Sequence, residues 1–335
     1  MKALISIFFF LILINYGCQD NSNSSVTDNK ILSEKIQPAK WNIIDSINIK
    51  NINSDLKPGQ LTMDVGVYFP SNFDTAFKKV TLPLLMTSIK NAKEIYASTG
   101  VQINLLFVKT GIVDPKYFTL QANEIPDVPQ TEYANMYQHM FRHPAILTKT
   151  AEVALKSIVE PHPDNHRTIY LIVLQDVFFP FLTVSEGRNW IIKSVRTGGL
   201  SFPTYSYVNE IPAALRGVIT ISNLQRPDRL RRTVAHEIGH KTINVSHEYG
   251  EINPENEVFA EGGLMVYGNG EEIPSGEKGR WHKERLQLSP FLYRLNEDGK
   301  KIWNPEYKEA GHYYDPLYKN YVIHFNGLAQ IAEDW

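Results

Sequence analysis

The stretch of the chain best suited to chemistry holds two histidines four residues apart, His236 and His240, with Glu237 between them. In a helix, residues four apart share one face and lie about 6 Å apart along the axis. Both imidazoles can therefore point at one tetrahedral Zn²⁺ ion. Glu237 lies near the same rim, where it can accept a proton from a water molecule that the metal activates. The pattern H-E-x-x-H thus indicates a zinc site equipped for hydrolysis.

The preceding residues predict the helix that this site needs. Pro227 suits the first turn of a helix, and Asp228 favours its positive end. Leu230, Val234 and Ile238 form an apolar stripe at i, i+4 spacing, nearly opposite the two histidines. We therefore expect a helix that packs one face on the core and presents the other face to a cleft.

Residues 236–247 resemble the metzincin clan of zinc peptidases, whose pattern is H-E-x-x-H-x-x-G-x-x-H followed by a methionine turn. The stretch Gly263-Leu264-Met265-Val266-Tyr267-Gly268 resembles that turn. The resemblance implies that Met265 lies beneath the metal ion and that Tyr267 lies near it. It also implies an α/β, metzincin-like zincin fold: a mixed twisted sheet with an active-site helix and a smaller C-terminal lobe.

The third histidine of the metzincin pattern is displaced by one residue. The expected glycine and histidine positions hold Ile243 and Ser246, whereas His247 comes one residue late. The glycine lets the helix end in a left-handed conformation, and asparagine is the next-best residue for it. The stretch 244–247 therefore resembles the same turn with Asn244 in place of glycine, after one extra helical residue of about 1.5 Å and about 100°. We predict His247 as the third zinc ligand.

A carboxylate is the alternative third ligand. The stretch 256–261 resembles the glutamate-bearing helix of the gluzincins, the other large H-E-x-x-H group. Glu257 follows His240 by 17 residues and Glu261 follows it by 21, which straddles the usual gap without matching it. Both glutamates also suit the solvated face of a short helix, and Met265 suits an ordinary core position. Because Met265 and His247 agree on one fold, we prefer His247.

The N-terminus has the pattern of an export signal. The apolar run 3–14 follows a positive residue and is short for a transmembrane span. It leads to Cys18, the only cysteine, which resembles the lipid-attachment cysteine of bacterial lipoproteins. Gly17 fits the small residue before the cleavage point, whereas Asn15 departs from the usual apolar residue. We predict a lipoprotein in the bacterial cell envelope, with secretion as the alternative; once Cys18 is acylated, no thiol remains for a disulfide.

Composition divides the chain into three parts. Residues 1–17 form the predicted lipoprotein signal peptide. Residues 18–40, rich in asparagine and serine near their start, are predicted to form a flexible tether. Residues 41–335 are predicted to form one zinc metallopeptidase domain, with an upper lobe at about 41–243 and a C-terminal lobe at about 244–335.

The charge balance is nearly neutral. The net charge is −2, and loss of the signal peptide removes a single lysine, which leaves −3. The chain has no dense basic run. Composition therefore argues against nucleic acid as a partner.

Apolar patterning upstream of the metal-binding stretch predicts strand, long helix, strand, which is how metzincin domains open. Strands are expected at 61–69, 101–108, 168–174 and 217–222, and helices at 82–98, 131–143 and 145–159. The stretch 168–174 is the most apolar strand and suits the centre of the sheet. Residues of about 113–166 would be an insertion in a minimal peptidase domain. Its helical His139 and His143 share the i, i+4 spacing and could form a second metal site, but without an adjacent carboxylate they are expected at the surface. One segment between 189 and 208 would be the edge strand that holds an extended peptide.

These patterns together predict a membrane-tethered zinc endopeptidase that hydrolyses a peptide or protein substrate. Zinc held by three histidines would lower the pKa of its water towards about 7. Glu237 would act as general base, and zinc with Tyr267 would stabilise the oxyanion. The alternative is a membrane-anchored surface lipoprotein that binds a partner through a catalytically silent zinc site. The displaced third histidine favours that alternative, whereas Glu237, which metal binding does not need, favours the enzyme.

Overall fold

The computed structural model describes a large part of the chain between Ala39 and Ile331. The described residues are 39–73, 79–122, 147–184, 190–201, 211–244, 263–265, 272–273, 280–305, 313–314, 321–323 and 329–331. All of them belong to one of the two units into which the chain divides, residues 37–335. The predicted signal peptide, Cys18 and the predicted helix 131–143 lie outside them. Within these ranges, no helix is both long and apolar enough to span a membrane.

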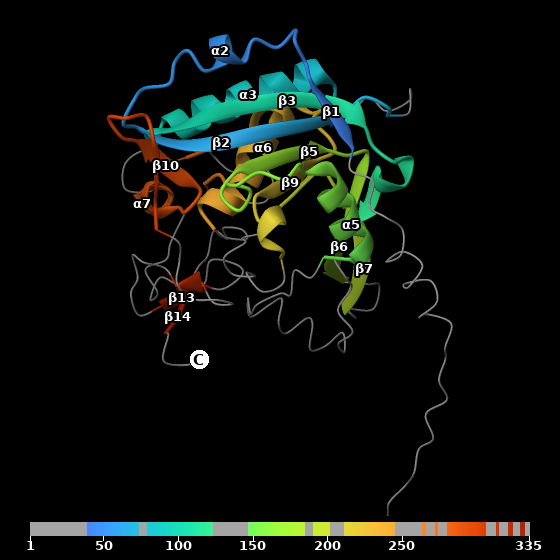
Figure 1. The fold of residues 1–335 in the computed structure, drawn as a ribbon. Helices are drawn as coiled ribbons and strands as arrows, with labels where there is room; N and C mark the ends of the chain where they lie inside the picture. Colours follow the sequence, from blue (N-terminus) through green and yellow to red (C-terminus); the bar gives the residue numbers. More distant parts are fainter. Residues whose placement is uncertain are drawn as a thin grey trace, which may run out of the picture. The chain divides into compact units, whose positions relative to one another are not determined.

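The main sheet is mixed and twisted (Figure 1). Its order is β1 (Lys40–Ile43), β3 (Val101–Ile112), β2 (Leu61–Pro70), β5 (Ile169–Val173), β9 (Val218–Ile221) and β8 (Gly199–Leu200). The four inner strands run parallel, and β1 and β8 pair antiparallel at the two ends. All four predicted strands are confirmed, and β5 is an inner strand as predicted. The edge strand was expected in 189–195 or 201–208; the observed edge strand, β8, lies between these two segments, and residues 190–197 form a strand of a second sheet.

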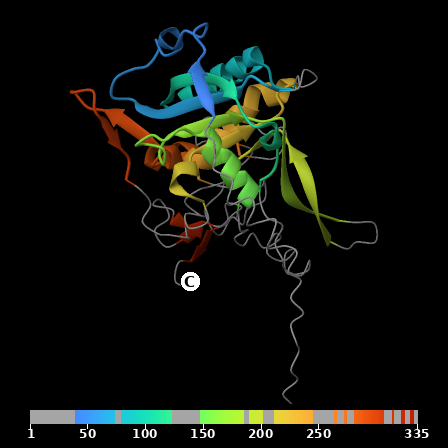
Figure 2. The same ribbon diagram turned by 45° about the vertical axis from the view of Figure 1, so that its right-hand side comes forward.

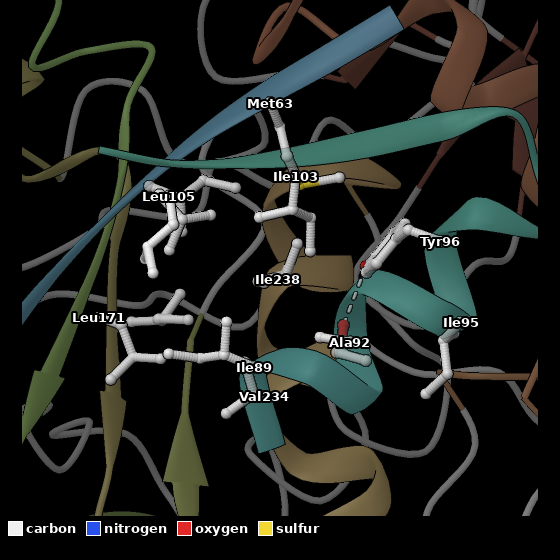
Figure 3. Close-up of a cluster of buried hydrophobic side chains, with 14 of the residues drawn as sticks. Met63, Ile89, Ala92, Ile95, Tyr96, Ile103, Leu105, Leu171, Val234 and Ile238 are labelled. Atoms are coloured by element: carbon white, nitrogen blue, oxygen red, sulfur yellow. Dashed lines mark hydrogen bonds between the residues drawn. The ribbon is translucent and has the colours of Figure 1, made fainter. Parts of the chain in front are cut away.

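Two helices, α3 (Leu82–Ala97) and α6 (Pro227–Thr242), pack together over one face of this sheet. Figure 3 shows Ile89 of α3 beside Val234 and Ile238 of α6, with Leu171 of β5 in the same cluster. The Tyr96 hydroxyl donates to the Ala235 carbonyl at 2.9 Å and links the two helices. The predicted helix 82–98 is therefore confirmed, and α6 is held against the core by α3.

The opposite face of the sheet is covered by α5 (Lys149–Ile158) and an aromatic cluster around Tyr68 and Tyr170. The α5 helix was predicted to begin at residue 145. It begins later because Thr148 is its N-cap, with a hydroxyl that accepts from the Ala151 amide at 3.0 Å. The alternation along β5 therefore divides its apolar side chains between two buried layers.

The C-terminal part of the chain returns to the main sheet through α7 (Arg280–Leu288), β10 (Leu292–Leu295) and β11 (Lys301–Trp303). Strand β10 pairs antiparallel with the beginning of β2. The buried Asp64 carboxylate of β2 accepts from the Tyr293 hydroxyl at 2.8 Å and from Lys301 Nζ at 2.5 Å. Sequence patterning did not predict these two strands. Both are short, β10 pairs with the distant strand β2, and β11 pairs with β10.

The remaining elements are short or lie beside the main sheet. Strands β4 (Thr119–Gln121), β6 (Asp176–Val184) and β7 (Trp190–Thr197) form a second sheet, whose long β6–β7 ribbon is the yellow-green hairpin of Figure 2. The others are α2 (Ile49–Ile52), two 3₁₀ turns at Pro115–Tyr117 and Ala213–Leu215, and β12 (Tyr313–Tyr314), β13 (Tyr321–Ile323) and β14 (Ala329–Ile331).

Candidate metal centre

Helix α6 carries the H-E-x-x-H residues, and its local sequence explains where it begins. Pro227 occupies the first turn, and Asp228 provides an acidic residue there, both as predicted. The predicted stripe is confirmed, since Val234 and Ile238 are buried in the core and Leu230 packs against it. The apolar contacts thus determine the rotation of the helix and, with it, the side on which the histidines lie.

The two histidines are brought together by one turn of α6. Their ring centroids lie 4.8 Å apart, with the ring planes at 86°. His236 Nδ1 lies 2.7 Å from the Leu264 carbonyl oxygen. A carbonyl oxygen can only accept, so Nδ1 carries the proton and Nε2 is the nitrogen whose lone pair can bind a metal.

Met265 packs directly against the turn that carries both histidines. The methionine is fully buried. A Cβ atom at Gly239 would collide with the Met265 sulfur, so a glycine between the histidines is required for this approach. The resemblance implies that Met265 lies beneath a metal ion, and the structure shows that its side chain packs against Gly239.

The Glu237 side chain packs closely against the backbone of the edge strand β8 at Gly199. Glu237 is 5% exposed, and a Cβ atom at Gly199 would lie 2.5 Å from its Oε1 and 2.9 Å from its Cδ. Among the residues that the structure describes, Oε2 has no hydrogen-bond partner. An acceptor that is buried without a donor is costly unless a ligand or water completes it. This carboxylate is therefore a candidate for direct contact with a bound molecule.

Burial perturbs the titration of three groups on this part of α6. It lowers the pKa of His236 to about 4, against the opposing effect of the Leu264 carbonyl. It raises the pKa of Glu237 well above its ordinary value, partly offset by the positive charge of Lys241. Burial also lowers the pKa of Lys241 to about 7. Neutral His236 is the form that a metal requires, and a more basic Glu237 suits a proton acceptor.

The end of α6 follows the prediction made for Asn244. Its φ is 58°, and it is the one non-glycine residue with positive φ in the described part of the chain. The helix continues to Thr242, its C-cap is Ile243, and the chain adopts the predicted left-handed conformation at Asn244. The buried Arg285 guanidinium of α7 donates to the carbonyls of Ile243 at 2.8 Å and Asn244 at 3.3 Å. These bonds satisfy carbonyls that the helix end leaves without partners.

Several predicted site residues lie outside the described residues. These are His247, the competing Glu257 and Glu261, Tyr267, and the insertion histidines His139 and His143. Within the ranges that are described, no three or more His, Cys, Asp or Glu side chains group together as a metal site would require.

The structure adds residues that sequence reasoning missed. Lys241 follows His240 directly and lies one turn from Glu237, a spacing that could have signalled an interaction. The Gly198-Gly199 doublet could have signalled a close backbone approach. Arg285 and the Leu264 carbonyl gave no such signal, because their contacts join segments far apart in the chain.

Sequence comparisons add no relative to this description. No protein-family model matches the chain, and a search of characterised proteins found no match.

Proposed function

We propose that this protein is a zinc-dependent endopeptidase with a metzincin-like fold. The observation that carries the proposal is the bond from His236 Nδ1 to the Leu264 carbonyl, beside a buried Glu237 with an unpartnered oxygen. The bond selects the tautomer that a metal ligand needs, and Glu237 supplies the proton acceptor that hydrolysis needs. The buried Met265 against Gly239 and the left-handed Asn244 support the metzincin-like arrangement.

The donor set suits Zn²⁺. His236 and His240 would hold the ion, with His247 as the proposed third ligand and Glu257 or Glu261 as its competitors. Neutral imidazoles are common zinc ligands, and three protein ligands are typical of a catalytic site. Zinc, when bound, supplies Lewis-acid polarisation of a water molecule and of the scissile carbonyl.

Glu237 would move the proton during hydrolysis. Its carboxylate would accept a proton from the attacking water and deliver it to the leaving amine. Burial keeps this carboxylate basic, which favours the first transfer. Tyr267 would donate to the developing oxyanion.

The edge strand β8 would position the substrate. It is the last strand of the sheet path, pairs on one side with β9 and contacts Glu237 through Gly199. An extended peptide that adds to a free strand edge is held by backbone hydrogen bonds, with little demand on its sequence. A peptide bound to β8 would therefore run beside the general base.

The anchoring proposal follows from the N-terminal pattern alone. We propose a lipid chain on Cys18 that tethers the protein to the bacterial cell envelope. Cys18→Ser would then shed the protein from the membrane fraction or leave the signal uncleaved, because the lipid supplies the affinity. A processed Cys18→Ser protein that partitions into detergent like the wild type would contradict the anchor.

The decisive experiment compares the wild type with Glu237→Gln on one diverse peptide pool at matched zinc occupancy. Because Glu237 is not needed to hold zinc, the variant should keep the metal and the fold yet lose about 10²–10⁴ in rate. Glu160→Gln, on the opposite side of the sheet, is the matched control and should digest like the wild type. Indistinguishable digests from the wild type and Glu237→Gln would remove Glu237 from its role. If both proteins are inert and a partner protein still binds, the alternative function is favoured: a surface lipoprotein that binds a partner through a catalytically silent zinc site.

The third ligand needs a separate test. His247→Ala should weaken zinc binding far more than Glu257→Ala or Glu261→Ala, because loss of a direct ligand opens the tetrahedron. The measurement is zinc affinity by competition with a chromogenic chelator. A glutamate substitution that strips the metal while His247→Ala retains it would place the protein with the gluzincins.

A further inference from the structure

Two side chains of α6, one helical turn apart, bond to the same backbone carbonyl. His236 Nδ1 lies 2.7 Å from the Leu264 oxygen, and Arg232 Nη2 donates to that oxygen at 3.2 Å. Arg232 Nη2 also reaches the Gly263 carbonyl at 3.5 Å. Positions 232 and 236 share a helix face, so both side chains meet the segment that leads into Met265.

The direction of the Leu264 carbonyl decides which nitrogen of His236 carries the proton. If the carbonyl turned away, neutral His236 could place its proton on either nitrogen, and only the Nδ1–H form has an Nε2 lone pair. Gly262 and Gly263 directly precede Leu264. Glycine permits many backbone conformations, so the local sequence does little to fix this carbonyl.

An arginine is chemically suited to fix it. Its planar guanidinium offers several donors in a rigid arrangement and keeps its charge at any relevant pH. Here its Nη2 atom lies within hydrogen-bond distance of two successive carbonyls, those of Gly263 and Leu264. A lysine in the same place would present one compact, strongly hydrated charge and would constrain the two carbonyls less.

We propose that Arg232 is a positioning residue for His236. By holding the carbonyls of Gly263 and Leu264 against α6, it keeps His236 in the Nδ1–H tautomer, which can bind a metal ion through Nε2. The consequence for metal binding rests on the proposed function, whereas the tautomer is a property of the metal-free chain.

The neighbouring Arg231 provides the matched control. It also joins α6 to other segments, through ion pairs with Glu272 and with Glu94 at 2.7 Å. It has no recorded contact with the Leu264 carbonyl in the described part of the chain. Removal of Arg231 therefore tests the effect of losing an arginine tether on this helix without disturbing the bond to His236.

The experiment measures two quantities for the wild type, Arg232→Gln, Arg232→Lys and Arg231→Gln. The first is the His236 tautomer in metal-free protein, from ring ¹⁵N chemical shifts, with the signal assigned by its absence in His236→Gln. The second is zinc affinity by chelator competition. Arg232→Gln should give mixed tautomers and zinc affinity weaker by about 10–100-fold, the usual effect of losing a group that orients a metal ligand. Arg231→Gln should keep the Nδ1–H form and stay within about threefold of wild-type affinity.

Arg232→Lys keeps the charge, so its tautomer ratio and zinc affinity should lie between those of Arg232→Gln and Arg231→Gln. If Arg232→Gln does not fold, Arg232→Lys still tests the inference. Wild-type tautomer and affinity in both Arg232 variants would overturn the inference, as would an equal loss in Arg231→Gln. If the wild type takes up no zinc, the proposed function fails, and the tautomer comparison in metal-free protein still decides the role of Arg232.

Discussion

The two sides of α6 do opposite things, although both carry buried residues and only His236 on the second side is partly exposed. One side, here called the core face, consists of Val234, Ala235 and Ile238 and packs against α3 and the main sheet. The other side, the site face, consists of His236, Glu237 and His240. Glu237 and His240 are 5% and 4% exposed, close to the values for core residues. Burial alone therefore does not distinguish Glu237 and His240 from core residues; the chemistry of their side chains does.

Burial of the core face stabilises the folded state, whereas burial of the site face disfavours the charged forms of its ionisable groups. Apolar surface removed from water contributes about 25 cal/mol per Å² to stability. Ionisable groups lose hydration instead, which lowers the pKa of His236 and raises that of Glu237. The site face is oriented by backbone groups from other segments: the Leu264 carbonyl at His236 and Gly199 at Glu237. Apolar packing and the perturbed ionisable groups thus lie on different sides of one helix, and we expect that each can be perturbed alone.

The largest expected effect is on the core face. Ile238→Ala should lower the free energy of unfolding by about 2–5 kcal/mol, since it removes buried methyl groups and leaves a cavity. Urea unfolding measures this, and zinc affinity of the folded variant should stay near the wild-type value. Zinc affinity that falls in parallel with stability would show that the two faces are not separable.

Acid should weaken the site face of the metal-free protein. The pKa of His236 is about 4 in the fold and about 6.5 in the unfolded chain, which therefore binds a proton between these pH values that the fold excludes. Stability should fall as the pH falls from about 6.5 to 4, by at most about 3 kcal/mol from this group. Buried Glu237 has the opposite sign in part of this range. The contribution of His236 is therefore the difference between the wild type and His236→Gln in urea unfolding at each pH.

An equal pH dependence in the wild type and His236→Gln would contradict that assignment.

Gly199→Ala should affect catalysis and leave zinc binding intact. The new Cβ would occupy the place of the Glu237 carboxylate, and a small misplacement of a catalytic group costs about 10² in rate, or about 2.7 kcal/mol. The loss should appear in kcat. At Gly198 the new Cβ would lie 3.1 Å from the flexible Arg229 guanidinium, so Gly198→Ala is the matched control with activity near that of the wild type. Equal losses in both variants would indicate damage to β8 rather than displacement of Glu237.

The smallest effect on stability is expected at Asn244, directly after the C-terminal end of α6. A left-handed φ of 58° costs an alanine about 1–2 kcal/mol, a cost that glycine does not have. Asn244→Ala should therefore be less stable than Asn244→Gly by about that amount, and both lose the same side-chain contacts. Thermal unfolding of the pair measures the backbone effect, and equal stability would mean that the turn relaxes.

The apolar pattern was a sufficient guide where an element is long or forms an unbroken apolar run. The strands β2 and β3 and the helices α3 and α6 are long, and the short strands β5 and β9 are apolar runs buried on both faces; each was predicted within a few residues. Strands β8, β10 and β11 are two to four residues long and lack an unbroken apolar run. They form because β8 pairs with β9, β10 pairs with β2, and β11 pairs with β10, so their conformation depends on these partners.

The sequence by itself determined the reactive elements of the candidate site: the helical spacing of His236 and His240, the place of Glu237 between them, and the helix end at Asn244. All of these are local, because they depend on helical geometry or on the conformational preference of one residue. Only the tertiary structure decided how the reactive groups are oriented. The Leu264 carbonyl that selects the His236 tautomer is a backbone atom, and every residue type supplies the same carbonyl. Gly199 and Arg285 act across long separations in sequence, where contact depends on the packing of the whole sheet.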